Sequence, residues 1–129
     1  MSMKSVPTVL FFMSLAACSA LAFAGSDRFA GNYTCKGSNP LEKVANFTDT
    51  FTVTLQKKNT YTGVSTDTDG SLYPMIALSS GNDLYVAFTK PKNADFGVEH
   101  FKLKGKKLMG TFSYHATPTV VGTETCIKK

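Results

Sequence analysis

Apolar and polar side chains alternate along much of the chain, and the alternation is clearest over residues 47–57. From Phe47 to Leu55, apolar side chains occupy every second position apart from Asp49, and threonine fills the positions between them. Residues 97–103 alternate in the same way, with Glu99 on the same face as Phe101. Because successive side chains of a strand point to opposite faces, both segments are predicted to be β-strands with one buried face.

Similar short segments follow one another along the chain, separated by turn sequences. The predicted strands span residues 31–35, 47–57, 60–65, 72–78, 84–89, 97–103, 107–114 and 120–127. Turns or loops are expected at 36–40, 58–59, 66–70, 79–83, 90–96, 104–106 and 117–118, and one helical turn at 41–45. Proline has no N–H to donate to a ladder, so Pro74 is expected at a sheet edge or a bulge.

About eight short strands at even spacing, with no helix of ten residues, indicate an all-β fold. We predict a small antiparallel β-barrel. Glycines that suit the bends of such a barrel fall inside predicted strands at positions 63, 97, 110 and 122.

Residues 1–24 have the features of a signal peptide and lie outside the predicted domain. Lys4 precedes a long apolar run, and Ala22 and Ala24 fit a small-x-small cleavage site. Residues 25–129 are then one β-barrel domain, secreted or periplasmic. In an alternative interpretation, residues 15–18 form a bacterial lipoprotein signal. Cys18 would then be acylated and would anchor the protein to a membrane.

The chain contains three cysteines, and both interpretations of the N-terminus remove Cys18 from thiol chemistry. In an exported protein the remaining pair, Cys35 and Cys126, predicts one disulfide. That bond would join the first predicted strand to the last and favours a closed barrel, because closure removes exposed strand edges. A closed loop of this length contributes about 4 to 5 kcal/mol in the chain-entropy model.

Glu124 is the first candidate for ligand binding. If Cys126 points inward to meet Cys35, the two-residue period of a strand points Glu124 inward as well. Tyr33 shares the face of Cys35 and is predicted to donate a hydrogen bond to Glu124. An inward carboxyl group with an aromatic partner can orient a polar group of a ligand or act as an acid of raised pKa. The alternative is a purely structural carboxylate.

A basic hairpin is the second candidate, as a surface for an anionic or acidic partner. Its predicted partner-binding residues are Lys102, Lys104, Lys106 and Lys107. The alternative role of these lysines is solubility and protection of strand edges.

The composition and motifs give no sign of catalysis, a cofactor or a metal site. The formal net charge of +5 is spread along the chain and predicts no specific nucleic-acid contact. No Gly-x-Ser-x-Gly elbow is present, and His100 and His115 lack ligand spacing for zinc. Residues 65–70 imitate a calcium loop only in part. We expect a monomer that is not an enzyme.

Four motifs resemble a family of small exported proteins of Gram-negative bacteria. They are Gly-x-Tyr-x-Cys, Gly-Asn-x-Leu-x-Val-x-Phe, Leu-x-Gly-Thr-Phe and Gly-Thr-Glu, at residues 31–35, 81–88, 108–112 and 122–124. That family has no assigned activity, so the resemblance implies an exported location and a β-barrel fold only.

The Tyr33-x-Cys35 start and the Gly70-x-x-Tyr73 loop are similar to those of envelope inhibitors of C-type lysozyme. This resemblance implies that Gly70 and Tyr73 contact a partner protein. Position 67 holds Asp where those inhibitors have Ser, and the chain has no Trp. The Gly31-x-Tyr33 start is similar to the Gly-x-Trp of lipocalins.

The leading functional prediction is an exported, non-enzymatic binding module. It would use loops at one barrel end to bind a protein partner or a small ligand. The alternative is an inhibitor of a host or competitor hydrolase such as lysozyme, with the basic hairpin or residues 70–73 entering an acidic cleft.

Overall fold

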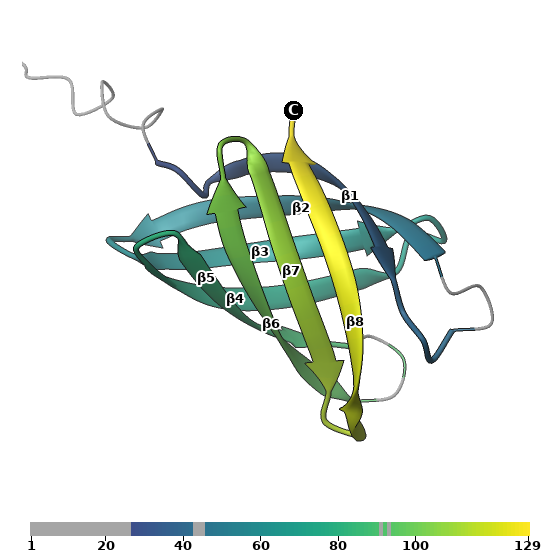
Figure 1. The fold of residues 1–129 in the computed structure, drawn as a ribbon. Coiled ribbons are helices and arrows are strands. Elements are labelled where there is room, and N and C mark those ends of the chain that lie inside the picture. The colour runs from purple at the N-terminus through teal and green to yellow at the C-terminus, as the bar shows by residue number, and fades with distance from the viewer. Residues whose placement is uncertain (1–26, 43–45, 91, 93) are drawn as a thin grey trace, which may run out of the picture.

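The computed structural model describes residues 27–42, 46–90, 92 and 94–129, which form a closed barrel of eight strands (Figure 1). Each strand pairs antiparallel with the next, and β1 pairs with β8 to complete the ring. The predicted all-β antiparallel barrel is confirmed. Its strands are β1 (Gly31–Ser38), β2 (Asn46–Lys57), β3 (Thr60–Asp67), β4 (Leu72–Ser80), β5 (Asp83–Thr89), β6 (Phe96–Lys104), β7 (Lys107–Tyr114) and β8 (Thr117–Lys128).

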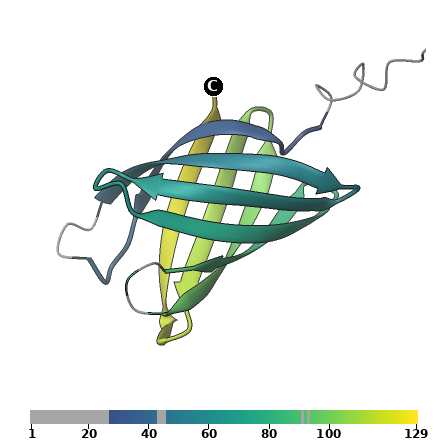
Figure 2. The ribbon, with the colours of Figure 1, turned by 180° about the vertical axis from the view of Figure 1, so that it is seen from behind.

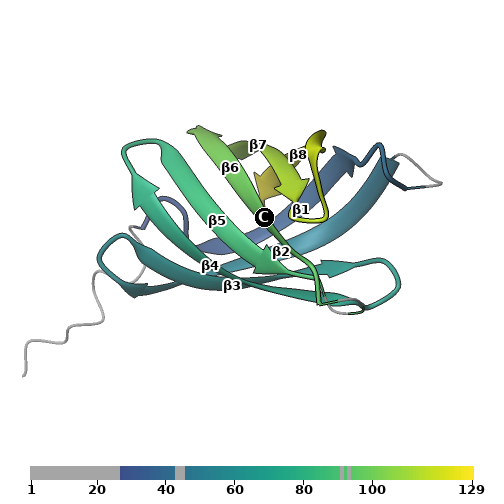
Figure 3. The same cartoon turned by 90° about the horizontal axis from the view of Figure 1, so that it is seen from below.

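Two groups of strands cross at a steep angle, with β2–β4 on one side of the barrel and β6–β8 on the other (Figures 1 and 2). The β2–β3 and β4–β5 turns lie at one end of the barrel, and the β3–β4 turn lies at the opposite end (Figure 3). Because every pair is antiparallel, the β6–β7 turn belongs to the first end and the β7–β8 turn to the second. In the described residues, no helix is long and apolar enough to cross a membrane.

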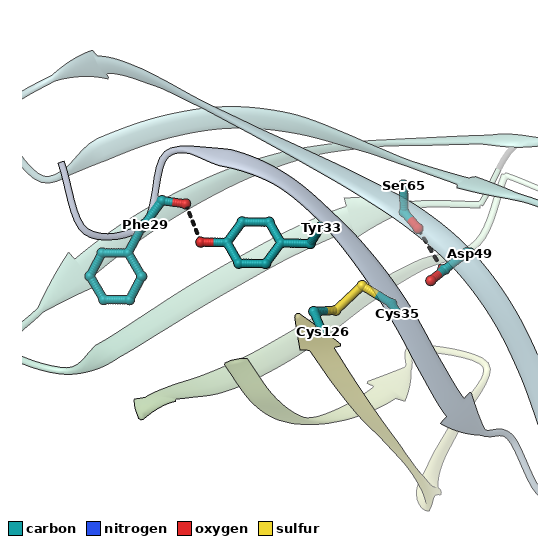
Figure 4. The surroundings of a disulfide bond; sticks show 6 residues. All are labelled: Phe29, Tyr33, Cys35, Asp49, Ser65 and Cys126. Atoms are coloured by element: carbon teal, nitrogen blue, oxygen red, sulfur yellow. Dashed lines mark hydrogen bonds between the residues drawn. A yellow bond between two sulfur atoms is a disulfide. The ribbon is translucent and has the colours of Figure 1, made fainter. Parts of the chain in front are cut away.

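Cys35 and Cys126 lie directly opposite each other on β1 and β8 and form the predicted disulfide (Figure 4). Their Cα atoms are 4.0 Å apart, and both side chains are fully buried. The ring is therefore closed by a covalent bond as well as by backbone hydrogen bonds.

Large apolar side chains fill the barrel on one side of this disulfide. Phe51 of β2 stacks on Phe101 of β6 with ring centroids 5.6 Å apart, and it packs against Tyr33 at 5.9 Å. Leu84 and Leu108 are fully buried beside them. Each such side chain contributes about 1.5 to 3 kcal/mol to stability when it leaves water. This half of the barrel supplies most of the apolar core.

Residues 27–30 cover the filled end of the barrel. Phe29 is 2% exposed, and its carbonyl accepts a 2.7 Å hydrogen bond from the Tyr33 hydroxyl. The Tyr61 hydroxyl donates to Asp27 Oδ2 at 2.9 Å. Asp27 Oδ1 also accepts from the backbone N–H of Phe29 at 2.9 Å, which fixes the bend of this segment. We call this the closed end.

Four phenylalanine rings lie over glycines that face them directly on the neighbouring strand. The pairs are Phe47 with Gly37, Phe88 with Gly97, Phe101 with Gly110, and Phe112 with Gly122. A Cβ atom at any of the four glycines would overlap the ring. The rings therefore require glycine at these positions, and this contact is the observed reason for three of the glycines inside predicted strands.

Several strands are longer than the sequence pattern predicts. β1 continues to Ser38 through residues expected to turn, β3 continues to Asp67, and β8 begins at Thr117 rather than after a loop at 117–118. Ser38 pairs with Asn46 and Asp67 with Asp49. These polar residues are held extended by the neighbouring strand, a tertiary effect that local alternation does not reveal.

Pro74 lies inside β4, opposite Val64 of β3, and no bulge interrupts that ladder. Of the two expected positions, the bulge is not observed, and the edge is present only locally, on the side of β4 that faces β5. On that side, the β4–β5 ladder begins only at Met75. No residue of β5 therefore requires a hydrogen bond from an N–H at position 74, which proline lacks. Of the predicted helical turn, residues 43–45 lie outside the described residues, as do Cys18 and the whole predicted signal peptide.

Gly122→Ala is expected to lower the free energy of unfolding by about 1 to 3 kcal/mol, because the new methyl group overlaps the Phe112 ring. Thr123→Ala is the matched control, since the neighbouring side chain is exposed on the outer face. Urea unfolding followed by circular dichroism measures both. Equal stability of the two variants would contradict the role given to the glycine.

Candidate ligand-binding site

A cavity of about 940 Å³ occupies the barrel end opposite residues 27–30, which we call the open end. Its lining comes from inward-facing residues near the ends of the strands and from the β3–β4 turn. The disulfide lies between the two halves: Phe29 and Tyr33 are on its closed side, and Asp49 and Ser65 are on its open side (Figure 4).

Small residues at inward positions leave this half of the barrel unfilled. Gly37, Ser65 and Gly122 take positions there that are comparable to those of Tyr33 and Phe101 in the filled half. The rings of Phe47 and Phe112 lie over Gly37 and Gly122 in the barrel wall instead of crossing the interior. The sequence therefore builds a barrel that is packed at one end and hollow at the other.

The cavity wall is aromatic. The ring of Phe47 lies 5.9 Å from that of Phe112, and Tyr114 packs edge-on against Phe112 at 5.9 Å and Phe88 at 5.5 Å. At the rim, Lys90 Nζ lies 4.8 Å from the centre of the Tyr114 ring. A wall of this kind favours apolar groups and, through the faces of the rings, cations.

Three carboxyl groups form the floor of the cavity, next to the disulfide. Asp49 comes from β2, Glu99 from β6 and Glu124 from β8. Glu99 is 9% exposed and Glu124 is 8% exposed. The hydroxyl of Ser65 donates a 2.6 Å hydrogen bond to Asp49 Oδ2. Three acidic side chains from strands distant in sequence thus share one buried region.

Two oxygens of this floor have no hydrogen-bond partner among the described residues: Asp49 Oδ1 and Glu99 Oε1. An unpaired buried acceptor costs about 1 to 3 kcal/mol, and folded proteins contain few. The carboxyl group of Glu124 is hydrogen-bonded to both Asp49 and Glu99, so the acceptor capacity that the surrounding chain leaves unused is one oxygen of each of these two residues.

Burial is the main cause that raises the pKa of all three carboxyl groups. It raises the pKa of Glu99 to about 8. The pKa of Glu124 is raised further, because the charges of Glu99 and Asp49 also oppose its ionisation. The hydrogen bond from Ser65 partly offsets the effect of burial on the pKa of Asp49. The floor titrates as a coupled set, and Glu124 is a neutral acid at neutral pH.

An acidic turn forms part of the rim. Asp67 Oδ1 accepts from the backbone N–H groups of Asp69 and Ser71 at 3.1 Å each, and its Oδ2 accepts from the Tyr73 hydroxyl at 3.3 Å. Gly70 in this turn has a φ of 86°, which glycine adopts without strain. These carboxylates hold their own turn, which explains the partial likeness of this segment to a calcium loop.

The structure places the predicted site residues in three different regions. Glu124 points inward and lies in the floor, as its spacing from Cys126 predicts. Tyr33 does not bond to Glu124, because its hydroxyl donates to Phe29 on the closed side of the disulfide. Gly70 is at the rim and Tyr73 lines the cavity.

The predicted partner-binding lysines lie away from the cavity. Lys104, Lys106 and Lys107 surround the β6–β7 turn at the closed end. On the outer face, Lys102 Nζ lies 3.4 Å from Asp83 Oδ1. The basic hairpin and the loop of Gly70 therefore lie at opposite ends of the barrel and do not form one surface.

Asp49 and Glu99 are functional candidates that the sequence analysis missed. Both were placed on the apolar face of their strands by the two-residue period. An acidic residue on a predicted buried face was therefore the available signal, and Glu124 was singled out only through the neighbouring cysteine.

The described residues contain one group of metal-ligand atoms within 4.8 Å of one another, formed by Glu124 with Cys35 and Cys126. The two sulfurs are bonded to each other in the disulfide, so they cannot bind a metal as thiolates. This group does not constitute a metal centre.

No protein-family model matches the chain, and no curated protein matches it in sequence. Solved structures of similar fold include EF1p2_mFAP2b bound to DFHBI, with a TM-score of 0.60 and 10% identity over 79% of this chain and 94% of that one. Another is apo lipid binding protein 8 of Caenorhabditis elegans, with a TM-score of 0.50 and 12% identity over 84% of this chain and 100% of that one. At these identities the likeness establishes a shared barrel fold.

Glu99→Gln is expected to flatten the dependence of stability on pH. In the folded protein Glu99 keeps its proton up to a pKa of about 8, whereas in the unfolded chain it loses that proton at the ordinary glutamate pKa of 4.5. The free energy of unfolding is therefore highest below pH 4.5 and falls as the pH rises toward about 8. Glutamine stays neutral, so the variant should be more stable than the parent by roughly 2 to 4 kcal/mol at pH 8.

Urea unfolding at pH 5 and pH 8 measures this effect. Glu42→Gln, which removes an exposed carboxylate at the rim, is the matched control and should keep the slope of the parent protein. An unchanged slope in Glu99→Gln would show that Glu99 is already ionised in the folded protein.

Proposed function

We propose that this protein is a non-enzymatic binding module that takes a small ligand into the cavity at its open end. The observation that carries the proposal is the combination of a large cavity with unpaired acceptors at its floor. Binding sites for small molecules typically have volumes of about 300 to 1,000 Å³ and combine apolar walls with a few polar groups. The described cavity has both properties.

The asymmetry of the barrel supports this proposal. One half is filled by side chains and covered by residues 27–30, which gives a rigid support. The other half holds aromatic rings around unfilled space. A barrel that needed only to be stable gains nothing from three carboxyl groups in its interior, because buried acids cost stability when they ionise.

The names of the two structural neighbours support a binding role. One is in complex with DFHBI, and the other is called a lipid binding protein. Neither is named as an enzyme. We therefore propose binding without catalysis, with Glu124, Glu99 and Asp49 as ligand-contacting residues and Tyr73 at the entrance.

We also propose that the protein is exported and that residues 25–129 form its mature domain. The buried disulfide supports an oxidising compartment, secreted or periplasmic. Inhibition of a hydrolase such as lysozyme stays a prediction of the sequence.

Mass spectrometry of the protein recovered from an expressing bacterial host is expected to show a mature N-terminus at Gly25. Cleavage after Ala24 follows the small-x-small pattern of the sequence. A mature chain that begins at a lipidated Cys18 would replace soluble export by membrane anchoring. Retention of Met1 in a cytoplasmic product would contradict export.

The cavity can be tested with Nile red, a neutral apolar dye whose fluorescence rises when it leaves water. Met75→Trp places a large ring in the cavity and should abolish saturable dye binding. Ile76→Trp is the matched control, because the next side chain along β4 is 56% exposed on the outer face. This control should bind like the parent protein.

The outer face also carries a shallow apolar hollow, of about 610 Å³, beside Ile76. If Ile76→Trp abolishes dye binding and Met75→Trp does not, the dye occupies this outer hollow and the proposed cavity function is wrong.

A further inference from the structure

We propose that the ligand is a primary amine with an apolar body, whose ammonium group binds at the floor beside Glu99 and Asp49 and whose body lies against the aromatic wall. This inference rests on the proposed binding function and specifies the chemical class of the ligand. It follows from the unpaired oxygens, the charge of the lining and the shape of the cavity.

The first argument is hydrogen-bonding capacity. Glu99 is nine-tenths buried, lines the cavity and has an oxygen without a partner among the described residues. Asp49 offers a second such oxygen. A primary ammonium group carries three donors and no acceptor, so it matches a site whose unused groups are acceptors. A quaternary ammonium has no donor for them, and a carboxylate ligand would add acceptors where acceptors are already in excess.

The second argument is charge. The residues that line the cavity include six with carboxyl groups and one lysine, Lys36, whose side chain is exposed. At the rim, Lys90 lies over the Tyr114 ring, and Lys92 Nζ lies 3.7 Å from Asp69 Oδ2. An acidic pocket with low-dielectric walls concentrates the field of its carboxylates and attracts cations.

The third argument is size and wall chemistry. A bare metal ion needs only a few ångströms of coordinating space, and the floor carboxyl groups do not bring three ligand atoms together within 4.8 Å. The cavity of about 940 Å³ is walled by Phe47, Phe88, Phe112 and Tyr114, which suit an alkyl or aryl group. The site therefore favours an organic cation with a sizeable apolar part over an inorganic ion.

Binding of the amine is linked to loss of a proton from the floor. The ligand enters as an ammonium ion, one protonated carboxyl group releases its proton to water, and the resulting carboxylate pairs with the ammonium. Asp49 on β2, Tyr114 on β7 and Glu124 on β8 are the titratable groups that interact with Glu99, and Asp67 on β3 and Tyr73 on β4 line the same cavity. No cation faces Glu99 among these elements, so the affinity for the amine rises with pH between pH 5 and pH 8.

The test compares three eight-carbon probes by isothermal titration calorimetry at pH 8: octylamine, 1-octanol and octanoate. They share a chain and differ in the charge of the head group. Octylamine is expected to bind at least about tenfold more tightly than 1-octanol, and octanoate more weakly than both. Titrations of octylamine in two buffers of different ionisation heat should also reveal proton release at pH 7.

The variant Glu99→Gln tests the contact between the ligand's head group and Glu99 without changing the shape of the side chain. It should lower the affinity for octylamine about tenfold and leave that for 1-octanol unchanged, since glutamine keeps the shape and removes the charge. Glu42→Gln removes a carboxylate at the rim and should change the affinity for octylamine less than threefold.

The outcomes distinguish this inference from the proposed function. Octanoate or 1-octanol binding as tightly as octylamine overturns the amine assignment and leaves ligand binding intact. Nile red binding that depends on Met75 without binding of octylamine also overturns the amine assignment. If Nile red and all three probes fail to bind, the cavity function itself is wrong.

Discussion

The pairing of β1 with β8, held by the Cys35–Cys126 disulfide, is the constraint on which the rest of the structure depends. It joins strands at opposite ends of the chain, a contact of high entropic cost during folding. Once it forms, every strand has two neighbours and no edge stays exposed. It also brings Glu124 to the interior, because this residue shares the face of Cys126. Closure and the acidic floor therefore have the same structural origin.

The two halves of the barrel differ in how their interiors are packed. Tyr33, Phe51 and Phe101 fill the half beneath residues 27–30, so the apolar contacts that stabilise the fold are concentrated there. The other half tolerates unfilled volume and buried acids, both of which are destabilising. The disulfide lies at the boundary and anchors the hollow half to the packed one. The separation explains how so small a domain can carry a cavity of this size.

The sequence predicts the architecture well and the site only in part. Alternation identified the inward faces of β2, β5, β6 and β7, and the spacing from Cys126 placed Glu124 inside. It gave no inward face for β3, and in β4 the apolar Leu72, Ile76 and Leu78 point outward. It could not show that Asp49, Glu99 and Glu124 meet, because their distances depend on the strand register and tilt of the closed ring. The predicted hydrogen bond from Tyr33 to Glu124 was wrong for the same reason. Two side chains that both point into the barrel can lie at different heights along its axis. Tyr33 and Glu124 lie on opposite sides of the disulfide.

The placement of the disulfide also sets how the molecule responds to mechanical load. The bridged cysteines are 91 positions apart in sequence, and Cys126 is close to the end of the chain. Tension applied between the two ends passes directly through the sulfur–sulfur bond and bypasses β2 to β7. A pulled molecule can peel only the short segments outside the bridge, so the hollow end keeps its shape under forces that would unravel an unbridged barrel.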